Sequence, residues 1–176
     1  MPRQAIEQGF SLVEMLAALT MLAIGMGGLA LIFTTAVMGN ARAKGDTTGT
    51  MLAQTILEKI ASQPADTATA LSLIDCNSAG GTTWNIATAP GGAPLDSSGA
   101  IYFTQAAVPN YSMQFVSCGS GGRQATFDVR WKVQTITAHS RAITVSARPA
   151  AMGNGGGGNQ ALLYAQPITL RTVGGL

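Results

Sequence analysis

The chain has 176 residues, enough for one modest domain beside a long N-terminal segment, and only 10% of them are charged. Its net charge of +2 is spread unevenly, because residues 120–176 hold six basic residues against Asp128 alone. This mild basic bias is far weaker than the composition of nucleic-acid-binding proteins. Composition therefore argues against a nucleic acid as the partner.

The N-terminal region changes abruptly from polar to apolar. Residues 1–9 are short and polar, with Arg3 opposed by Glu7, and the sequence Gly-Phe-Ser-Leu-Val-Glu from Gly9 to Glu14 leads into an apolar run that ends near Met38. A helix rises about 1.5 Å per residue, so this run can cross the roughly 30 Å hydrocarbon core of a bilayer. The sequence predicts one membrane-spanning helix.

Glu14 is the unusual residue of this region, because its carboxylate stands one turn into an otherwise apolar helix. A charged side chain at such a place costs on the order of 3 kcal/mol or more unless something pairs with it. We therefore expect Glu14 to be functional and to have a cationic partner.

The motif from Gly9 to Glu14 resembles the class III signal of type IV prepilins and pseudopilins. In that family a prepilin peptidase cuts after the glycine, the new terminal phenylalanine is N-methylated, and the glutamate is kept. The resemblance implies cleavage between Gly9 and Phe10, N-methylation of Phe10, and a role for Glu14 in assembly. The ammonium of Phe10 would pair with Glu14 of a neighbouring subunit, and a buried ion pair of this kind can set the register between subunits.

Two other interpretations of the N-terminus are an ordinary signal peptide and a plain membrane anchor. An ordinary signal has an apolar core of roughly 7–15 residues and a small-x-small cleavage site. Residues Ala41–Ala43 offer such a site, but the apolar run before them is too long. Neither interpretation explains Glu14 or a glycine directly before Phe10.

The helix is expected to continue beyond the apolar run. Apolar residues recur at helical spacing and form a stripe of Leu52, Ala53, Ile56, Leu57 and Ile60, and Pro64 ends the segment. Two glycine-containing stretches, Gly25–Gly28 and Gly45–Gly49, could weaken the helix. The alternative for the first stretch is close packing between helices through small residues, with Ala23 and Gly27 four residues apart. The stretches 21–30 and 52–58 resemble PilV-type minor pilins and the minor pseudopilins of type II secretion.

The remaining chain predicts a small antiparallel sheet. Residues Ala65–Ala100 are expected to form a variable loop region with one short helix near Thr67–Ile74. Strands are expected at Ile101–Ala107, Tyr111–Cys118 and Ile168–Val173, besides a hairpin. The hairpin joins residues 127–134, which alternate between apolar and polar with one face solvated, to residues 143–147 through a turn at 138–140.

Little in the sequence indicates chemistry beyond assembly. Cys76 and Cys118 are the only cysteines, so a periplasmic domain would pair them in one disulfide, with two free buried thiols as the alternative. The single histidine, His139, is expected in a solvated turn, and we predict no catalytic site, metal or cofactor. Five aromatic residues could form a platform but are expected in the core, namely Trp84, Tyr102, Tyr111, Trp131 and Tyr164. Five basic residues could form a DNA-binding face but are expected to be solvated surface charges, namely Arg123, Arg130, Lys132, Arg141 and Arg148.

These observations predict an α+β, type IV pilin-like protein in which a long N-terminal helix packs on a small antiparallel sheet. We predict a leader at 1–9, a transmembrane and polymerisation helix at 10–38, its amphipathic continuation at 39–63, and a periplasmic globular domain at 64–176. The resemblance implies a minor pilin that waits in the inner membrane and then enters a filament. Its partners would be other pilin subunits, the prepilin peptidase, the inner-membrane assembly platform and membrane lipid. The alternatives are a minor pseudopilin of type II secretion and a minor pilin for DNA uptake or adhesion.

Overall fold

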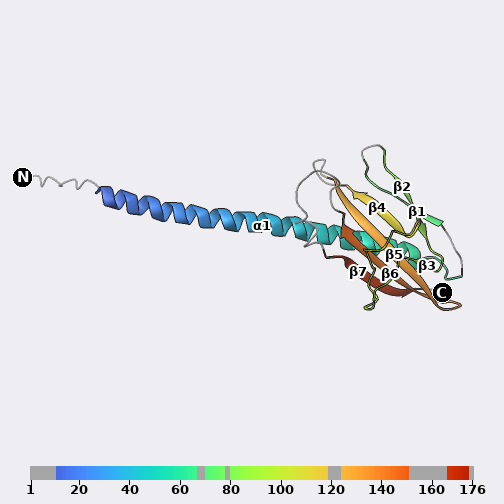
Figure 1. Cartoon of the computed structure of the whole chain (residues 1–176). Coiled ribbons are helices and arrows are strands. Elements are labelled where there is room, and N and C mark those ends of the chain that lie inside the picture. Colours follow the sequence, from blue (N-terminus) through green and yellow to red (C-terminus); the bar gives the residue numbers. More distant parts are fainter. Residues whose placement is uncertain (1–10, 67–69, 78–79, 119–123, 151–165, 175–176) are drawn as a thin grey trace, which may run out of the picture. The chain divides into compact units, whose positions relative to one another are not determined.

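The computed structural model describes residues 11–66, 70–77, 80–118, 124–150 and 166–174. Within these residues one long helix, α1 (Leu12–Ala61), is followed by strands in two antiparallel sheets, as Figure 1 shows. This arrangement confirms the predicted α+β fold. The chain divides into two compact units, residues 1–43 and 44–176, which are described separately.

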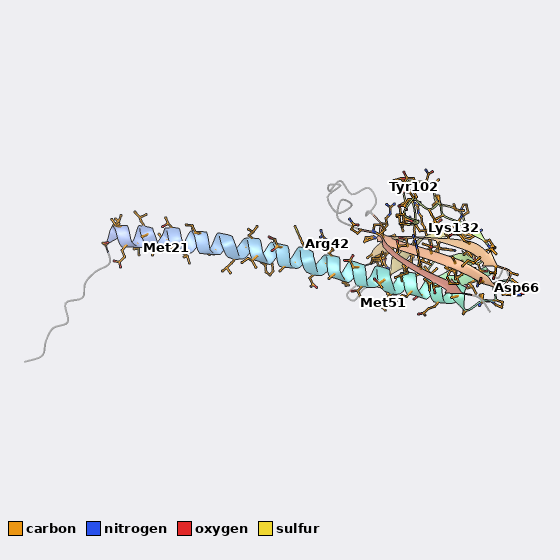
Figure 2. The ribbon with its side chains drawn as sticks, turned by 90° about the horizontal axis from the view of Figure 1, so that it is seen from below. Met21, Arg42, Met51, Asp66, Tyr102 and Lys132 are labelled. Atoms are coloured by element: carbon orange, nitrogen blue, oxygen red, sulfur yellow. A yellow bond between two sulfur atoms is a disulfide. The ribbon has the colours of Figure 1, made fainter. Side chains whose placement is uncertain are left out.

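The described part of the first unit is helical from Leu12 onward, and all of its side chains are exposed. Figure 2 shows these side chains standing out around the whole helix near Met21. Residues 25–28 are helical like their neighbours, so the glycines there do not interrupt α1.

In the second unit the last turns of α1 bury one face. Leu52, Ala53, Ile56 and Ile60 are buried, which confirms the predicted apolar stripe. The helix α1 is continuous through residues 45–49, so the glycines there do not interrupt it. Gly49 is buried where the sheet comes close: a Cβ on it would lie 3.2 Å from Ile168 Cδ1. The glycine therefore permits close packing between the helix and the sheet.

Among the described residues the larger sheet has five strands and the smaller has two. In the larger sheet β3 (Gly91–Gly92), β5 (Ala125–Thr137), β6 (Ser140–Pro149) and β7 (Ile168–Gly174) follow in that order, and β4 (Ser112–Ser117) also pairs with β5. The smaller sheet is β1 (Ala70–Ile74) with β2 (Thr83–Ala87). The core lies between α1 and the inner face of the larger sheet, which presents Phe127, Val129, Trp131, Val133, Ile143, Val145 and Ala147.

Most predicted strands are confirmed, but three expectations in the middle of the chain are wrong. The predicted strands at Tyr111–Cys118 and Ile168–Val173 correspond to β4 and β7, and the predicted hairpin corresponds to β5 and β6. The region Ala65–Ala100 holds β1, β2 and β3 rather than loops alone. Residues 70–74 of the expected helix Thr67–Ile74 are strand β1, while 67–69 lie outside the described residues. The expected strand Ile101–Ala107 is reduced to a single bridge between Ile101 and Leu95.

The outer face of β5 is covered, which the alternation in its sequence did not predict. Asp128 and Arg130 are buried there and form an ion pair with Nε 3.1 Å from Oδ1. The cover is the segment 93–110: Arg130 donates to Gln105 O at 2.7 Å, and the Phe103 ring packs on the guanidinium groups of Arg130 and Arg148. Figure 2 shows Tyr102, from this segment, on the side of the sheet opposite Met51 of α1. A buried charge needs such partners because an unpaired one is costly.

Arg141, at the start of β6, joins three parts of the second unit and is 2% exposed. Its guanidinium donates to Ile60 O, to Gln63 O at 2.6 Å and to Thr88 O at 3.2 Å. Ile60 lies in the last turn of α1 and Gln63 follows its end, where the helix dipole favours a cation. Burial lowers the pKa of this guanidinium from its ordinary value. Arg141 therefore caps α1 and ties its end to the sheet.

A disulfide ties the smaller sheet to the end of β4, and a buried carboxylate holds the hairpin of β1 and β2 together. Cys76 and Cys118 are paired, with Cα atoms 5.2 Å apart, as predicted. Next to Cys76, Asp75 accepts hydrogen bonds from the N–H of Thr82 at 2.6 Å and from the indole Nε1 of Trp84 at 3.0 Å. Burial alone would raise the pKa of Asp75, but the hydrogen bonds to its carboxylate outweigh burial and lower the pKa.

We expect Arg141→Gln to lower the free energy of unfolding of the second unit by about 2 kcal/mol, because it leaves carbonyls at the end of α1 without a charged donor. Urea unfolding of the detergent-solubilised chain, followed by tryptophan fluorescence, measures this. Arg171→Gln, at an exposed position of β7, is the matched control and should change stability little. Equal losses in the two variants would contradict the capping role of Arg141.

We expect Asp75 to make stability depend on pH. Its folded-state pKa lies below its unfolded value, so its contribution is fully present above the ordinary carboxyl pKa near 4 and is lost as the pH falls through the folded pKa. Urea unfolding from about pH 7 to about pH 3 measures this loss. Asp75→Asn should be less stable at neutral pH, and its stability should fall less on acidification. An unchanged pH profile in Asp75→Asn would contradict the prediction.

Candidate functional site

The start of α1 is built by Ser11, whose side chain accepts a hydrogen bond from the N–H of Glu14 at 3.2 Å. A serine at this place satisfies one of the free N–H groups of the first helical turn. The spacing Ser-x-x-Glu is that of a capping box, in which a glutamate favours the start of a helix. The cap that Ser11 forms was not predicted, although the four-residue pattern is visible in the sequence.

Glu14 lies in the first turn of α1 and is exposed. Its negative charge is favourable there because the N-terminal end of a helix carries a partial positive charge. The part of this chain that the structure describes gives the Glu14 carboxylate no ion pair or hydrogen bond. Gly9 and Phe10 lie outside the described residues, so the proposed cleavage, methylation and pairing stay predictions.

The surface of α1 that follows is apolar on every side. Its exposed large side chains include Leu16, Leu22 and Ile32, which are 56–66% exposed. The hydroxyls of Thr20, Thr34 and Thr35 each donate to a carbonyl of their own helix, at 2.8–2.9 Å. Bonded in this way, the threonines leave the helix no unsatisfied hydroxyl toward hydrocarbon. The helix is long and apolar enough to cross a membrane and lies near the N-terminus, which suggests membrane anchoring.

Of the five basic residues considered as a DNA-binding face, the four that the structure describes do not form one, and Lys132 is half-buried on β5. Arg130 and Arg141 are buried in the two contacts described above, and Arg148 bonds to Asp128 at 3.1 Å. Arg123 lies outside the described residues. The alternation in the sequence predicted that the cations of β5 are solvated. This prediction failed for Arg130 because the segment that covers it comes from elsewhere in the chain.

The aromatic residues and the histidine considered as candidates do not come together in one site within the described part of the chain. Trp131 is fully buried, and Trp84 and Tyr111 are partly buried against the core, whereas Tyr102 is 42% exposed. Tyr164 lies outside the described residues. His139 is exposed in the turn between β5 and β6. Among the described residues no group of three or more His, Cys, Asp or Glu side chains could hold a metal ion.

Comparison with known proteins agrees with the N-terminal motif. Residues 5–30 match the family described as the prokaryotic N-terminal methylation motif. Neither a curated protein nor a solved structure matches the chain significantly. The matched residues include the Gly9–Glu14 sequence and the first turns of α1. The chain therefore carries a type IV prepilin-like N-terminal signal on a type IV pilin-like α+β architecture, which supports a type IV pilin- or pseudopilin-type subunit.

Proposed function

We propose that this chain is a minor pilin, a structural subunit that is held in the inner membrane by its N-terminal helix and then enters a type IV pilus. The observation that supports the proposal is the match to the methylation motif at residues 5–30, a range that includes Gly9, Phe10 and Glu14. The prepilin peptidase cuts between Gly9 and Phe10, and Phe10 is N-methylated. The globular domain then lies in the periplasm until the assembly platform inserts the subunit.

The surface of α1 supports assembly through the helix. From Leu12 to Met38 its side chains are exposed, and Glu14 is the one charged residue there. Such a helix suits either lipid or the helices of neighbouring subunits, since both offer apolar contacts. Inside a bundle the Glu14 carboxylate needs a cation, and the new N-terminal ammonium of an adjacent subunit provides one. This ion pair sets the axial register between neighbouring helices.

The second candidate is a minor pseudopilin of type II secretion. Residues 52–58 carry part of the finer resemblance, which both classes share, so they do not separate the two. In this chain Leu52 and Ala53 pack on the sheet, while Glu58 is exposed. Deleting the gene and assaying pili and protein export separately distinguishes the two. A DNA-uptake role receives no support from Arg130 and Arg141, since both are buried.

The intact mass of the membrane-extracted protein tests processing. We expect a chain that begins at Phe10 and carries one added methyl group, in cells with an active prepilin peptidase. Cells without the peptidase are the control and should yield the chain from Met1. A mass that starts at Met1 in both strains would contradict the proposal, and a start after residue 43 would indicate an ordinary signal peptide.

Glu14→Ala tests assembly separately from membrane insertion. We expect the variant to stay in the membrane, because removing a charge makes the span more apolar, but to be depleted at least about tenfold from sheared filaments through loss of the ion pair. Thr20→Ala is the matched control, since its hydroxyl bonds only within the helix. Quantitative immunoblots of the membrane and filament fractions measure the ratio. Normal incorporation of Glu14→Ala would refute the pairing.

A further inference from the structure

The β7 strand lies at the rim of the larger sheet, as Figure 1 shows in red, and it pairs with β6 along one edge. No described residue pairs with its other edge. A strand edge of this kind presents free N–H and C=O groups, to which another extended chain can bind.

The register of the sheet identifies which groups of β7 are free. The N–H of Trp131 donates to Tyr111 O, and Trp131 O accepts from Ala93, so both backbone groups of Trp131 point away from β6. Hydrogen bonding alternates along antiparallel strands, and Trp131, Val145 and Leu170 are in register. The backbone groups of Val145 therefore bond to those of Leu170. The residues next to Leu170 in β7 then direct their N–H and C=O groups away from β6. The free positions are Thr169, Arg171 and Val173.

Two side chains at this edge of β7 are exposed to solvent. Val173 is 66% exposed, and Arg171 is exposed with one hydrogen bond, to Ser98 O at 3.3 Å. Beside them the outer face of the sheet forms an open hollow of about 500 Å³. The residues that line it include Leu95, Gly99, Gln134, Ala142, Arg171 and Val173. A strand added to β7 would place alternate side chains at the rim of this mainly apolar hollow.

The charge of Arg171 selects the occupant. If the β7 strands of two copies pair antiparallel, only one register uses all three free positions of both strands. In that register Arg171 of one copy lies opposite Arg171 of the other. Like charges directly opposite one another destabilise a strand pair, whereas opposite charges stabilise it. A second copy is therefore disfavoured. A strand with an acidic residue opposite Arg171 and an apolar residue opposite Val173 satisfies both the charge and the hollow.

We propose that the free edge of β7 binds an extended segment of another protein, with an acidic side chain opposite Arg171 and an apolar side chain opposite Val173. The binding is strand addition, in which the backbone of the segment bonds to Thr169, Arg171 and Val173. This site is in the second unit and does not depend on the N-terminal helix or on its proposed assembly.

The test uses the full chain in detergent micelles and three blocked seven-residue peptides of alternating threonine and valine. The first peptide has a central glutamate, the second has a central lysine, and the third has the glutamate with N-methylated amides on the bonding edge. Amide chemical shifts and hydrogen exchange at Thr169, Arg171 and Val173 report binding. We expect the glutamate peptide to protect these amides and to bind about threefold to tenfold more tightly than the lysine peptide, with no binding by the methylated one.

Two variants make the result specific. Arg171→Glu should reverse the preference between the glutamate and lysine peptides, because it reverses the sign of the cross-strand pair. Val173→Pro removes one free donor from an edge position that tolerates proline, and it should weaken binding, whereas Val173→Thr keeps the donor and should bind. The shifts of β6 amides show that each variant is folded.

Four results would overturn the proposal. The methylated peptide could bind as well as its parent, or the shifts could fall outside β7. The three amides could be protected at every protein concentration without peptide, which would mean that the chain itself covers this edge. Protection that rises with protein concentration would make a second copy the occupant.

Discussion

The fold of the second unit depends on how closely the last turns of α1 approach the sheet. The absence of a side chain at Gly49 brings the backbone of the helix near Phe127 and Ile168, and Ala53 keeps the next turn close. The larger side chains, such as Ile56 and Ile60, then fill the space against Trp131 and Val145 without exposure. Interiors are close-packed, so a bulkier residue at the point of closest approach would have to move the sheet. Small and large residues along one helical face thus set the spacing on which the core relies.

The same sheet is covered on its second face by an irregular segment rather than by a helix. Segment 93–110 places Phe103 on two guanidinium groups and offers Gln105 O to Arg130, so the buried Asp128 is shared between two arginines. A buried carboxylate with two cationic partners keeps its charge compensated. The outer layer is therefore held by charge and stacking, whereas the inner layer is held by apolar contact. The two layers together explain why β5 is buried on both faces.

Much of this arrangement could be predicted from the sequence, and the remainder could not for a physical reason. The N-terminal motif, the helical stripe, the β5–β6 hairpin and the two cysteines are local patterns or a simple count, and each was recognised. Strand β1 was mistaken for a helix because alanine-rich sequence favours helix locally, while its pairing with β2 depends on residues further along the chain. The burial of Arg130 and Arg141 was missed because their partners are distant: Gln105 is 25 residues away and Ile60 is 81 residues away. The cap at Ser11 was a local signal that was overlooked.

The disulfide has a consequence for the covering segment. Residues 93–110 lie between Cys76 and Cys118, so they belong to a covalent ring closed by that bond. A single break of the backbone anywhere in the segment opens the ring but separates no fragment from the molecule. A protease can therefore cut the covering segment once and still leave the subunit in one covalent piece.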